Sequence, residues 1–122
     1  SRTVEMSYST VERGLAQITA LVEQVTPADL ERPTPCSEWR VAELCDHVVN
    51  SIAGLAAMAN GGQPDWANAV HHDDPAAELR REGQALTEAL ESNDGTLPEG
   101  MAAAELAVHS YDLATALGRP TA

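Results

Sequence analysis

Apolar residues recur along the first part of the chain with the period of an α-helix. From about Ser9 to Val25 they follow the spacing i, i+4, i+7, i+11 and i+14, at Val11, Leu15, Ile18, Val22 and Val25. Side chains at these intervals share one face of a helix. Thr26-Pro27 should end the helix, because the residue before a proline avoids the helical region of backbone conformation. The pattern therefore predicts an amphipathic helix over residues 9–25.

A second amphipathic segment is predicted from about Val41 to Ala59. Its apolar face is formed by Val41, Leu44, Cys45, Val48, Ile52 and Leu55. The run Asn60-Gly61-Gly62 is typical of a helix C-terminus, where glycine readily takes a left-handed conformation. The connection before this helix, residues 26–40, is rich in proline, and we expect one short turn at Ala28-Asp29-Leu30. Trp39, at the end of this connection, is expected to pack down onto the helices.

Two further helices are predicted in the second half of the chain, one from about Pro75 to Glu91 and one from about Glu99 or Gly100 to Leu117. Asp74 should cap the first of them, whose inner face holds Leu79, Gly83, Leu86 and Leu90. Residues 60–75 form a loop that contains Trp66 and His71-His72-Asp73-Asp74, which we interpret as solvated. Four such helices without strand-like alternation predict an all-α four-helix bundle, a single domain over residues 1–122.

The charge of the chain narrows the classes of partner. Nineteen acidic residues against seven basic ones give a formal net charge of -12. Such a surface repels phosphate backbones and anionic lipids, so neither a nucleic acid nor a membrane is an expected partner. The longest run without charge, Val48–Pro64, is too short and too polar to span a bilayer. We expect a cytoplasmic protein, and the alanine-rich helices leave enough apolar surface for a homodimer.

A candidate metal site lies on two of the predicted helices. Glu105 and His109 are four residues apart, so they project from the same face of the last helix. His47 lies at the edge of the apolar stripe of the second helix. A carboxylate and two imidazoles from facing helices form a three-ligand set with open positions for water or substrate. The alternative is that Glu105 and His109 only pair with each other.

Cys36 and Cys45 are too few to define a disulfide framework, and their spacing does not suit a metal-binding or redox pair. Cys45 lies on the apolar stripe of the second helix and is expected to be a small buried side chain. Cys36 stands in a proline-rich turn. A packed thiol and a redox role, or a role near the metal, both remain open for it.

Two longer motifs carry a family resemblance. The first is Thr34-Pro-Cys-Ser-Glu-Trp39, followed by Val41 and Leu44-Cys-Asp-His-Val48; the second is Ala104-Glu-Leu-Ala-Val-His-Ser-Tyr-Asp-Leu-Ala114 with Gly118. Together they resemble the actinobacterial mycothiol-dependent maleylpyruvate isomerase-like N-terminal domain, part of the DinB-like metal-binding superfamily. The resemblance implies a DinB-like bundle with a divalent metal, commonly zinc, held by His47, Glu105 and His109. Ni²⁺ is an alternative to Zn²⁺.

The resemblance also suggests a reaction class. Family members are linked to transfer or isomerisation that depends on a small thiol such as mycothiol, so the expected partners are a small-molecule thiol and an electrophile. Asp112, three residues after His109, could orient a neighbouring ligand or act as a base, or it could be a surface or helix-packing carboxylate. A non-catalytic metal-binding or sensing module and a purely structural bundle are the competing interpretations. Arg40 departs from the family, since the second helix then lacks a side-chain acceptor at its start.

Overall fold

The computed structural model describes residues 2–67, 69–93 and 99–119. Its elements are α1 (Arg2–Glu23), the 3-10 turn η1 (Pro27–Asp29), α2 (Val41–Ala59), α3 (Pro75–Asn93) and α4 (Glu99–Ala116). The only strand-like pairing among these residues is an isolated bridge between Pro33 and Arg40. The predicted all-α fold, a four-helix bundle, is confirmed.

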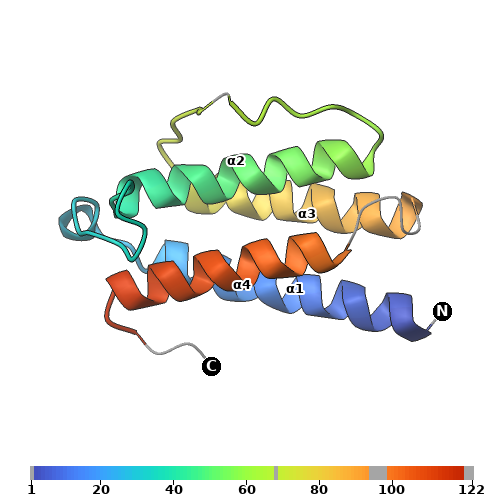
Figure 1. Cartoon of the computed structure of the whole chain (residues 1–122), viewed down its shortest axis with the longest axis horizontal. Helices are drawn as coiled ribbons and strands as arrows, with labels where there is room; N and C mark the ends of the chain where they lie inside the picture. The colour runs from blue at the N-terminus through green and yellow to red at the C-terminus, as the bar shows by residue number, and fades with distance from the viewer. Residues whose placement is uncertain (1, 68, 94–98, 120–122) are drawn as a thin grey trace.

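The four helices form two layers, α2 with α3 and α1 with α4 (Figure 1). The packing is most extensive within these layers, whereas α2 and α4 contact each other less. The loop over residues 60–74 runs back along the length of α2, so α2 and α3 point in the same direction (Figure 1). As a result, α2 and α4 are antiparallel neighbours across a loosely packed seam.

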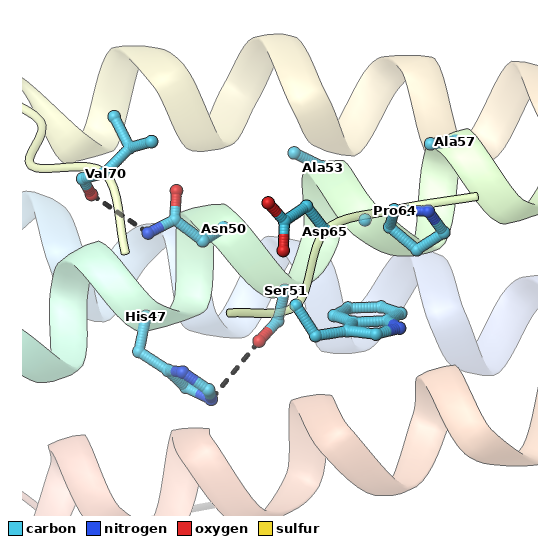
Figure 2. A pocket seen from close by; sticks show the side chains of 10 residues that line it. His47, Asn50, Ser51, Ala53, Ala57, Pro64, Asp65 and Val70 are labelled. Atoms are coloured by element: carbon cyan, nitrogen blue, oxygen red, sulfur yellow. Dashed lines mark hydrogen bonds between the residues drawn. The ribbon is translucent and has the colours of Figure 1, made fainter. Parts of the chain in front are cut away.

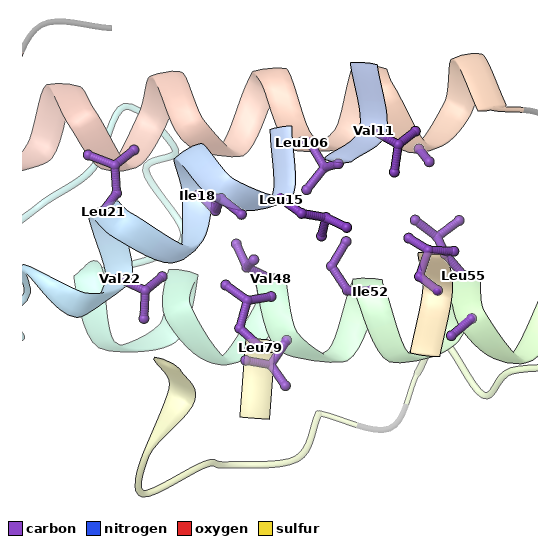
Figure 3. Close-up of a cluster of buried hydrophobic side chains, with 14 of the residues drawn as sticks. Val11, Leu15, Ile18, Leu21, Val22, Val48, Ile52, Leu55, Leu79 and Leu106 are labelled. Atoms are coloured by element: carbon purple, nitrogen blue, oxygen red, sulfur yellow. The ribbon is translucent and has the colours of Figure 1, made fainter. Parts of the chain in front are cut away.

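The apolar stripes predicted from the sequence form the core (Figure 3). On α1, Val11, Leu15, Ile18 and Val22 are buried, and on α3 the same is true of Leu79, Leu86 and Leu90. All six predicted apolar positions of α2 are buried as well. The helical period therefore identified the inner faces correctly, because each helix buries one stripe against its neighbours.

The ends of α1 differ from the prediction. The helix begins at Arg2 instead of Ser9, and Val4 and Tyr8 continue the spacing of Val11 toward the N-terminus. It ends at Glu23, before Val25, because the next backbone bonds join Gln24 to Leu21 and Val25 to Val22 and so tighten the last turn.

The other boundaries lie close to their predicted positions. The short turn occupies Pro27–Asp29, α3 continues past Glu91 to Asn93, and α4 ends at Ala116, one residue before Leu117. Differences of this size are usual at helix ends, which fray and tighten.

The predicted helix ends are formed by the expected chemistry. The Oδ1 atom of Asp74 accepts a hydrogen bond from the Ala77 N–H at 3.2 Å. Gly61 has a φ of 84°, and the N–H of Gly62 reaches back to the Ala57 carbonyl at 2.8 Å, which closes the C-terminus of α2. Gly118, with a φ of 68°, stands just beyond the end of α4.

Arg40 begins α2 without a side-chain acceptor, as predicted, but the helix start is still satisfied. The Oε1 atom of Glu43 accepts the backbone N–H of Arg40 at 3.1 Å, which is one half of a capping box. The guanidinium of Arg40 donates to the carbonyl of Glu31 at 2.7 Å and so ties the preceding connection to the helix. Among the described helices, none combines the length and the apolar character needed to cross a membrane.

Candidate metal site

The α2–α4 seam brings together the three residues singled out as ligands. One ligand atom each from His47, Glu105 and His109 lies within 4.8 Å of the others. The Nε2–H of His109 donates to Oε2 of Glu105 at 2.9 Å. The rings of His47 and His109 stand edge to face with centroids 4.7 Å apart. Two helices thus supply three donor groups around one point.

Burial differs across this triad. His109 is only 8% exposed, whereas the side chain of Glu105 is 44% exposed and His47 is half-buried. The Nδ1 atom of His109 is buried, and among the described residues it has no hydrogen-bond partner. A buried polar atom without a partner is costly, and in a native structure it points to a bound ion or water.

His47 is held from two sides. The ring of Trp39 lies against it, with centroids 4.1 Å apart, and the Ser51 hydroxyl is 3.2 Å from its Nε2 atom. Burial lowers the pKa of His47, and the nearby His109 lowers it further, while Glu105 acts in the opposite direction. The neutral imidazole, which is the form that binds a metal, is therefore favoured.

Trp39 reaches His47 because the preceding connection folds around Thr34. The Thr34 hydroxyl lies 2.8 Å from the carbonyl oxygen of Trp39 and 2.8 Å from that of Cys36. The backbone N–H of Cys36 donates back to the same hydroxyl at 3.1 Å. The Thr34–Trp39 motif is therefore a compact turn that places an indole against His47, whereas the sequence predicted only that Trp39 packs onto the helices.

Three cavities border His47 of the triad, and Trp66 also lines all of them. The largest, about 430 Å³, also borders Glu105 and His109. A second, about 280 Å³, is shown in Figure 2, where His47 points from α2 toward the neighbouring helix. A third, of about 400 Å³, extends along the outer side of α2. The three donor groups are thus accessible to a small molecule.

The loop over residues 60–74, here called the strap, is tied to α2 beside His47. The side-chain N–H of Asn50 donates to the Val70 carbonyl at 2.9 Å (Figure 2), and its Oδ1 accepts from Nε2 of His72 at 2.8 Å. Asp46 accepts from Nδ1 of His71 at 2.8 Å and from the backbone N–H of His72 at 3.0 Å.

The predicted loop is solvated at His71, Asp73 and Asp74, but the prediction missed that the strap is anchored to α2. The side chain of His71 is 73% exposed, yet its bond to Asp46 raises its pKa and fixes the strap to the helix. The physical reason is that Asp46 and Asn50, one helical turn apart, offer acceptors and a donor to the strap backbone and its histidines.

Trp66 is the residue of the strap that closes over α2. Its side chain lies against Gly54, and it is 58% exposed. Since Gly54 has no side chain, the indole can rest directly on the helix backbone next to the site. Trp66 is thus a large, partly exposed aromatic surface that lines all three cavities.

Asp112 and the two cysteines lie outside this arrangement. Asp112 is half-buried on α4. It makes no hydrogen bond to the Nδ1 atom of His109, which has no partner among the described residues. Its role as orienting group or base stays a prediction. Cys45 is 1% exposed, and burial raises its pKa to about 12, which agrees with a packed thiol. Cys36 borders a separate cavity together with Arg40 and Glu43.

Sequence reasoning missed several side chains of the site. Ser51, Asp46 and Asn50 all lie within one helical turn of His47, so a helical projection of α2 could have placed them nearby. Trp66 gave a weaker signal, because nothing in the sequence says where a loop side chain returns to the bundle. Its partner Gly54, a glycine inside a helix, was the clue to a close approach.

Comparison with known proteins agrees with this geometry. The profile of the family described as "Mycothiol maleylpyruvate isomerase N-terminal domain" matches residues 11–114. The chain belongs to this family. The matched range contains all three residues of the triad and supports the resemblance seen in the two motifs.

Two curated relatives come from strains of Mycobacterium tuberculosis, Uncharacterized protein Rv0738 and Uncharacterized protein MT0763. Each is 29% identical to this member of the mycothiol maleylpyruvate isomerase N-terminal domain family over an alignment that covers 90% of the chain. The chain spans 66% of the length of these relatives. No solved structure gives a significant match.

Proposed function

We propose that this domain binds one divalent metal ion through His47, Glu105 and His109 and uses the site with a small thiol. The observation that carries the proposal is the convergence of three donor atoms within 4.8 Å beside a cavity of about 430 Å³. Membership of a family named for a mycothiol-linked isomerase supports the thiol. Zinc is the metal we favour, with nickel as the alternative, because both accept imidazole and carboxylate ligands.

The donor set fits such an ion. Two imidazoles and a carboxylate are the ligands found in catalytic zinc sites that keep a position open. The unpartnered Nδ1 atom of His109 shows that the hydrogen bonds of this buried ring are incomplete. Binding through Nε2 of His109 would require the proton that this atom donates to Glu105 to move to Nδ1 of the same ring, which has no partner among the described residues.

The reaction that suits the site is transfer of a thiol sulfur to an electrophilic carbon. A bound divalent ion would lower the pKa of a thiol at the open position and so supply a nucleophile near neutral pH. In an addition to a C=C bond, the sulfur lone pair forms the S–C bond, the electrons of the broken π bond move to the neighbouring carbon, that carbon takes up a proton, and the thiol proton goes to a base. In a substitution, the leaving group departs with the electrons of the broken bond.

The residues of the chain would position the reactants. Trp39 and Ser51 hold the ring of His47, and Trp66 lines the cavities. Asp112 remains a candidate base or orienting group, three residues after His109 on α4.

Two other functions compete with this one. A metal-binding or sensing module would hold the ion without turnover. A purely structural bundle would use only the 2.9 Å bond between His109 and Glu105. That bond alone does not explain why His47 places a second imidazole 4.7 Å from the first, so we rank the structural bundle third.

Metal analysis separates the structural bundle from the other two functions. Protein purified without an affinity-column metal or chelator should contain about one divalent ion per chain. His47→Ala and His109→Ala should each lose it, whereas His72→Ala, a histidine of the strap outside the triad, should keep it. If the wild-type protein contains no metal and binds no added zinc, both metal-dependent functions are excluded.

A thiol titration then separates the enzyme from the sensing module. In protein loaded with Co²⁺, a bound thiolate adds a sulfur-to-metal charge-transfer absorption. Mycothiol should produce this band in wild-type protein but not in His109→Ala. Metal binding without any thiol band would instead favour the sensing module.

A further inference from the structure

The three cavities at the triad differ in chemistry. The largest has an apolar wall formed by Leu55, Met58, Trp66 and Met101, next to the three residues of the triad. The cavity shown in Figure 2 contains Asn50 and Asp65, and the third contains Glu43, Asp46 and His71. The largest cavity therefore suits an apolar body, and the other two suit polar groups.

Carboxylates predominate among the charged side chains that line the three cavities, and His71, whose pKa is raised, is already paired with Asp46. Among the described residues that line the three cavities, there is no arginine or lysine. Four carboxylates line them instead, from Glu43, Asp46, Asp65 and Glu105. Transferring a carboxylate from water into an apolar cavity without a cationic partner is costly. A dicarboxylate of the maleylpyruvate type finds no arginine or lysine among these described residues, and His71 is already paired with Asp46.

We propose that the cavity walled by Leu55, Met58, Trp66 and Met101 is a subsite for an uncharged molecule with an apolar, preferably aromatic, body, and that Trp66 determines its specificity. The inference deepens the proposed function, since it names the class of electrophile that would lie beside the metal. Binding of the apolar body itself does not require the ion, which lets the two proposals be tested separately.

Trp66 suits this role because of how it is held. Gly54 supports one side of the indole, and the strap is fixed to α2 through Asn50 and Asp46. More than half of the side chain remains exposed, so part of the ring system is free to contact a ligand. An aromatic surface fixed before binding loses little conformational freedom when it stacks on an aromatic ligand.

The experiment uses two naphthalene probes of nearly equal size, neutral 1-naphthalenemethanol and anionic 1-naphthoate. Each displaces the fluorescent neutral dye N-phenyl-1-naphthylamine from the full chain, first after chelator treatment and then with zinc added. Metal-free protein should bind the alcohol about tenfold more tightly than the carboxylate, or better. Equal affinity, or a preference for the carboxylate, would overturn the proposal.

Variants locate the subsite. Trp66→Ala should weaken binding of the alcohol at least about fivefold. Tyr111→Ala is the matched control, because Tyr111 is also aromatic and also 58% exposed but does not border the cavity. Met58→Glu introduces a carboxylate into the cavity without changing a residue of the strap, and it should also weaken binding of the alcohol. Unchanged binding in both Trp66→Ala and Met58→Glu would place the probe elsewhere and reject the assignment.

The outcome is separable from that of the metal proposal. A protein that takes up no metal but still prefers the alcohol through Trp66 would keep the subsite and reject the proposed function. A protein that binds zinc but shows no preference between the probes would keep the proposed metal site and reject the apolar subsite. Unchanged circular dichroism spectra in the variants confirm that the bundle is intact.

Discussion

The indole of Trp66 rests on Gly54 at a distance that leaves no room for a side chain. A Cβ atom built on Gly54 would lie 2.5 Å from the nearest atom of the Trp66 ring. The contact joins a loop to the middle of a helix, and it sets the position of the aromatic surface beside the triad.

Replacing Gly54 with alanine should therefore displace Trp66. Elsewhere in a helix, a glycine-to-alanine change stabilises by about 0.5–1 kcal/mol. Here the clash involves the outer edge of a partly exposed ring, so we expect the ring to move and overall stability to change little. Tryptophan fluorescence should shift to longer wavelength, while helix content stays constant.

Gly83→Ala provides the control for this substitution. The three atoms nearest to a Cβ on Gly83 all belong to the side chain of Leu15, the closest at 3.3 Å, and none belongs to Trp66. Its tryptophan emission should match that of the wild-type protein. A Gly54→Ala protein with unaltered emission would mean that the strap does not depend on this contact.

The two cysteines should react very differently with a thiol-alkylating reagent. Cys36 is half-buried in the turn before Trp39, whereas Cys45 is 1% exposed and burial raises its pKa to about 12. At pH 8, iodoacetamide should modify Cys36 first, and Cys45 only on unfolding. Mass spectrometry of peptides from briefly treated protein gives the answer directly. Rapid labelling of Cys45 in folded protein would contradict its packing.

The raised pKa of Cys45 also predicts a loss of stability in alkali. The thiol of an unfolded chain has a pKa of about 8.5, so above this pH the unfolded chain loses the Cys45 proton. The folded chain keeps this proton up to about pH 12. Stability should fall with rising pH across this window. Cys45→Ala should remove that part of the slope in urea unfolding measured between pH 8 and pH 10.

Asp29 predicts a pH effect of the opposite sign. Its carboxylate accepts the backbone N–H of Thr26 at 2.9 Å and the Thr26 hydroxyl at 3.0 Å, and these bonds lower its pKa below the ordinary 3.8. Arg32, 3.3 Å away, adds to the effect. The stabilisation is present above the unfolded pKa and disappears as the pH falls through the lower folded value.

Comparing wild-type protein with Asp29→Ala at two pH values tests this assignment. The variant should be less stable at pH 7, and the difference should shrink at pH 2–3, where the wild-type carboxyl is protonated too. Thr10→Ala, a polar substitution on exposed α1 surface, should show no such convergence. If the stability difference between the wild-type protein and Asp29→Ala does not depend on pH, the stabilisation by Asp29 comes from packing and not from its charge.

The sequence predicted the helices and their inner faces well, because a helix that buries one face carries apolar residues at regular helical intervals. Val11, Ile18 and Leu79 are examples of positions predicted to lie inside and found there. The parallel course of α2 and α3 was not foreseen, since a long loop is compatible with either direction. The homodimer stays a prediction.

The site was only partly visible in the sequence for a related reason. Glu105 and His109 are neighbours on one helix, so their proximity follows from helical geometry alone. The position of His47 opposite them depends on how α2 packs on α4. The family motifs implied this packing, but the local sequence pattern could not predict it. The strap contacts of His71 and His72 depend on tertiary anchors that leave no periodic trace.

The antiparallel seam between α2 and α4 has a consequence for how the protein matures. His47 belongs to the second helix and its two companions to the fourth, so the donor cluster does not exist while the chain is still emerging from the ribosome. A half-made chain displays at most a single imidazole of the triad, which holds a divalent ion only weakly. Binding of the proposed ion would therefore follow the docking of α4, and an ion that joins the two helices would stabilise the finished bundle.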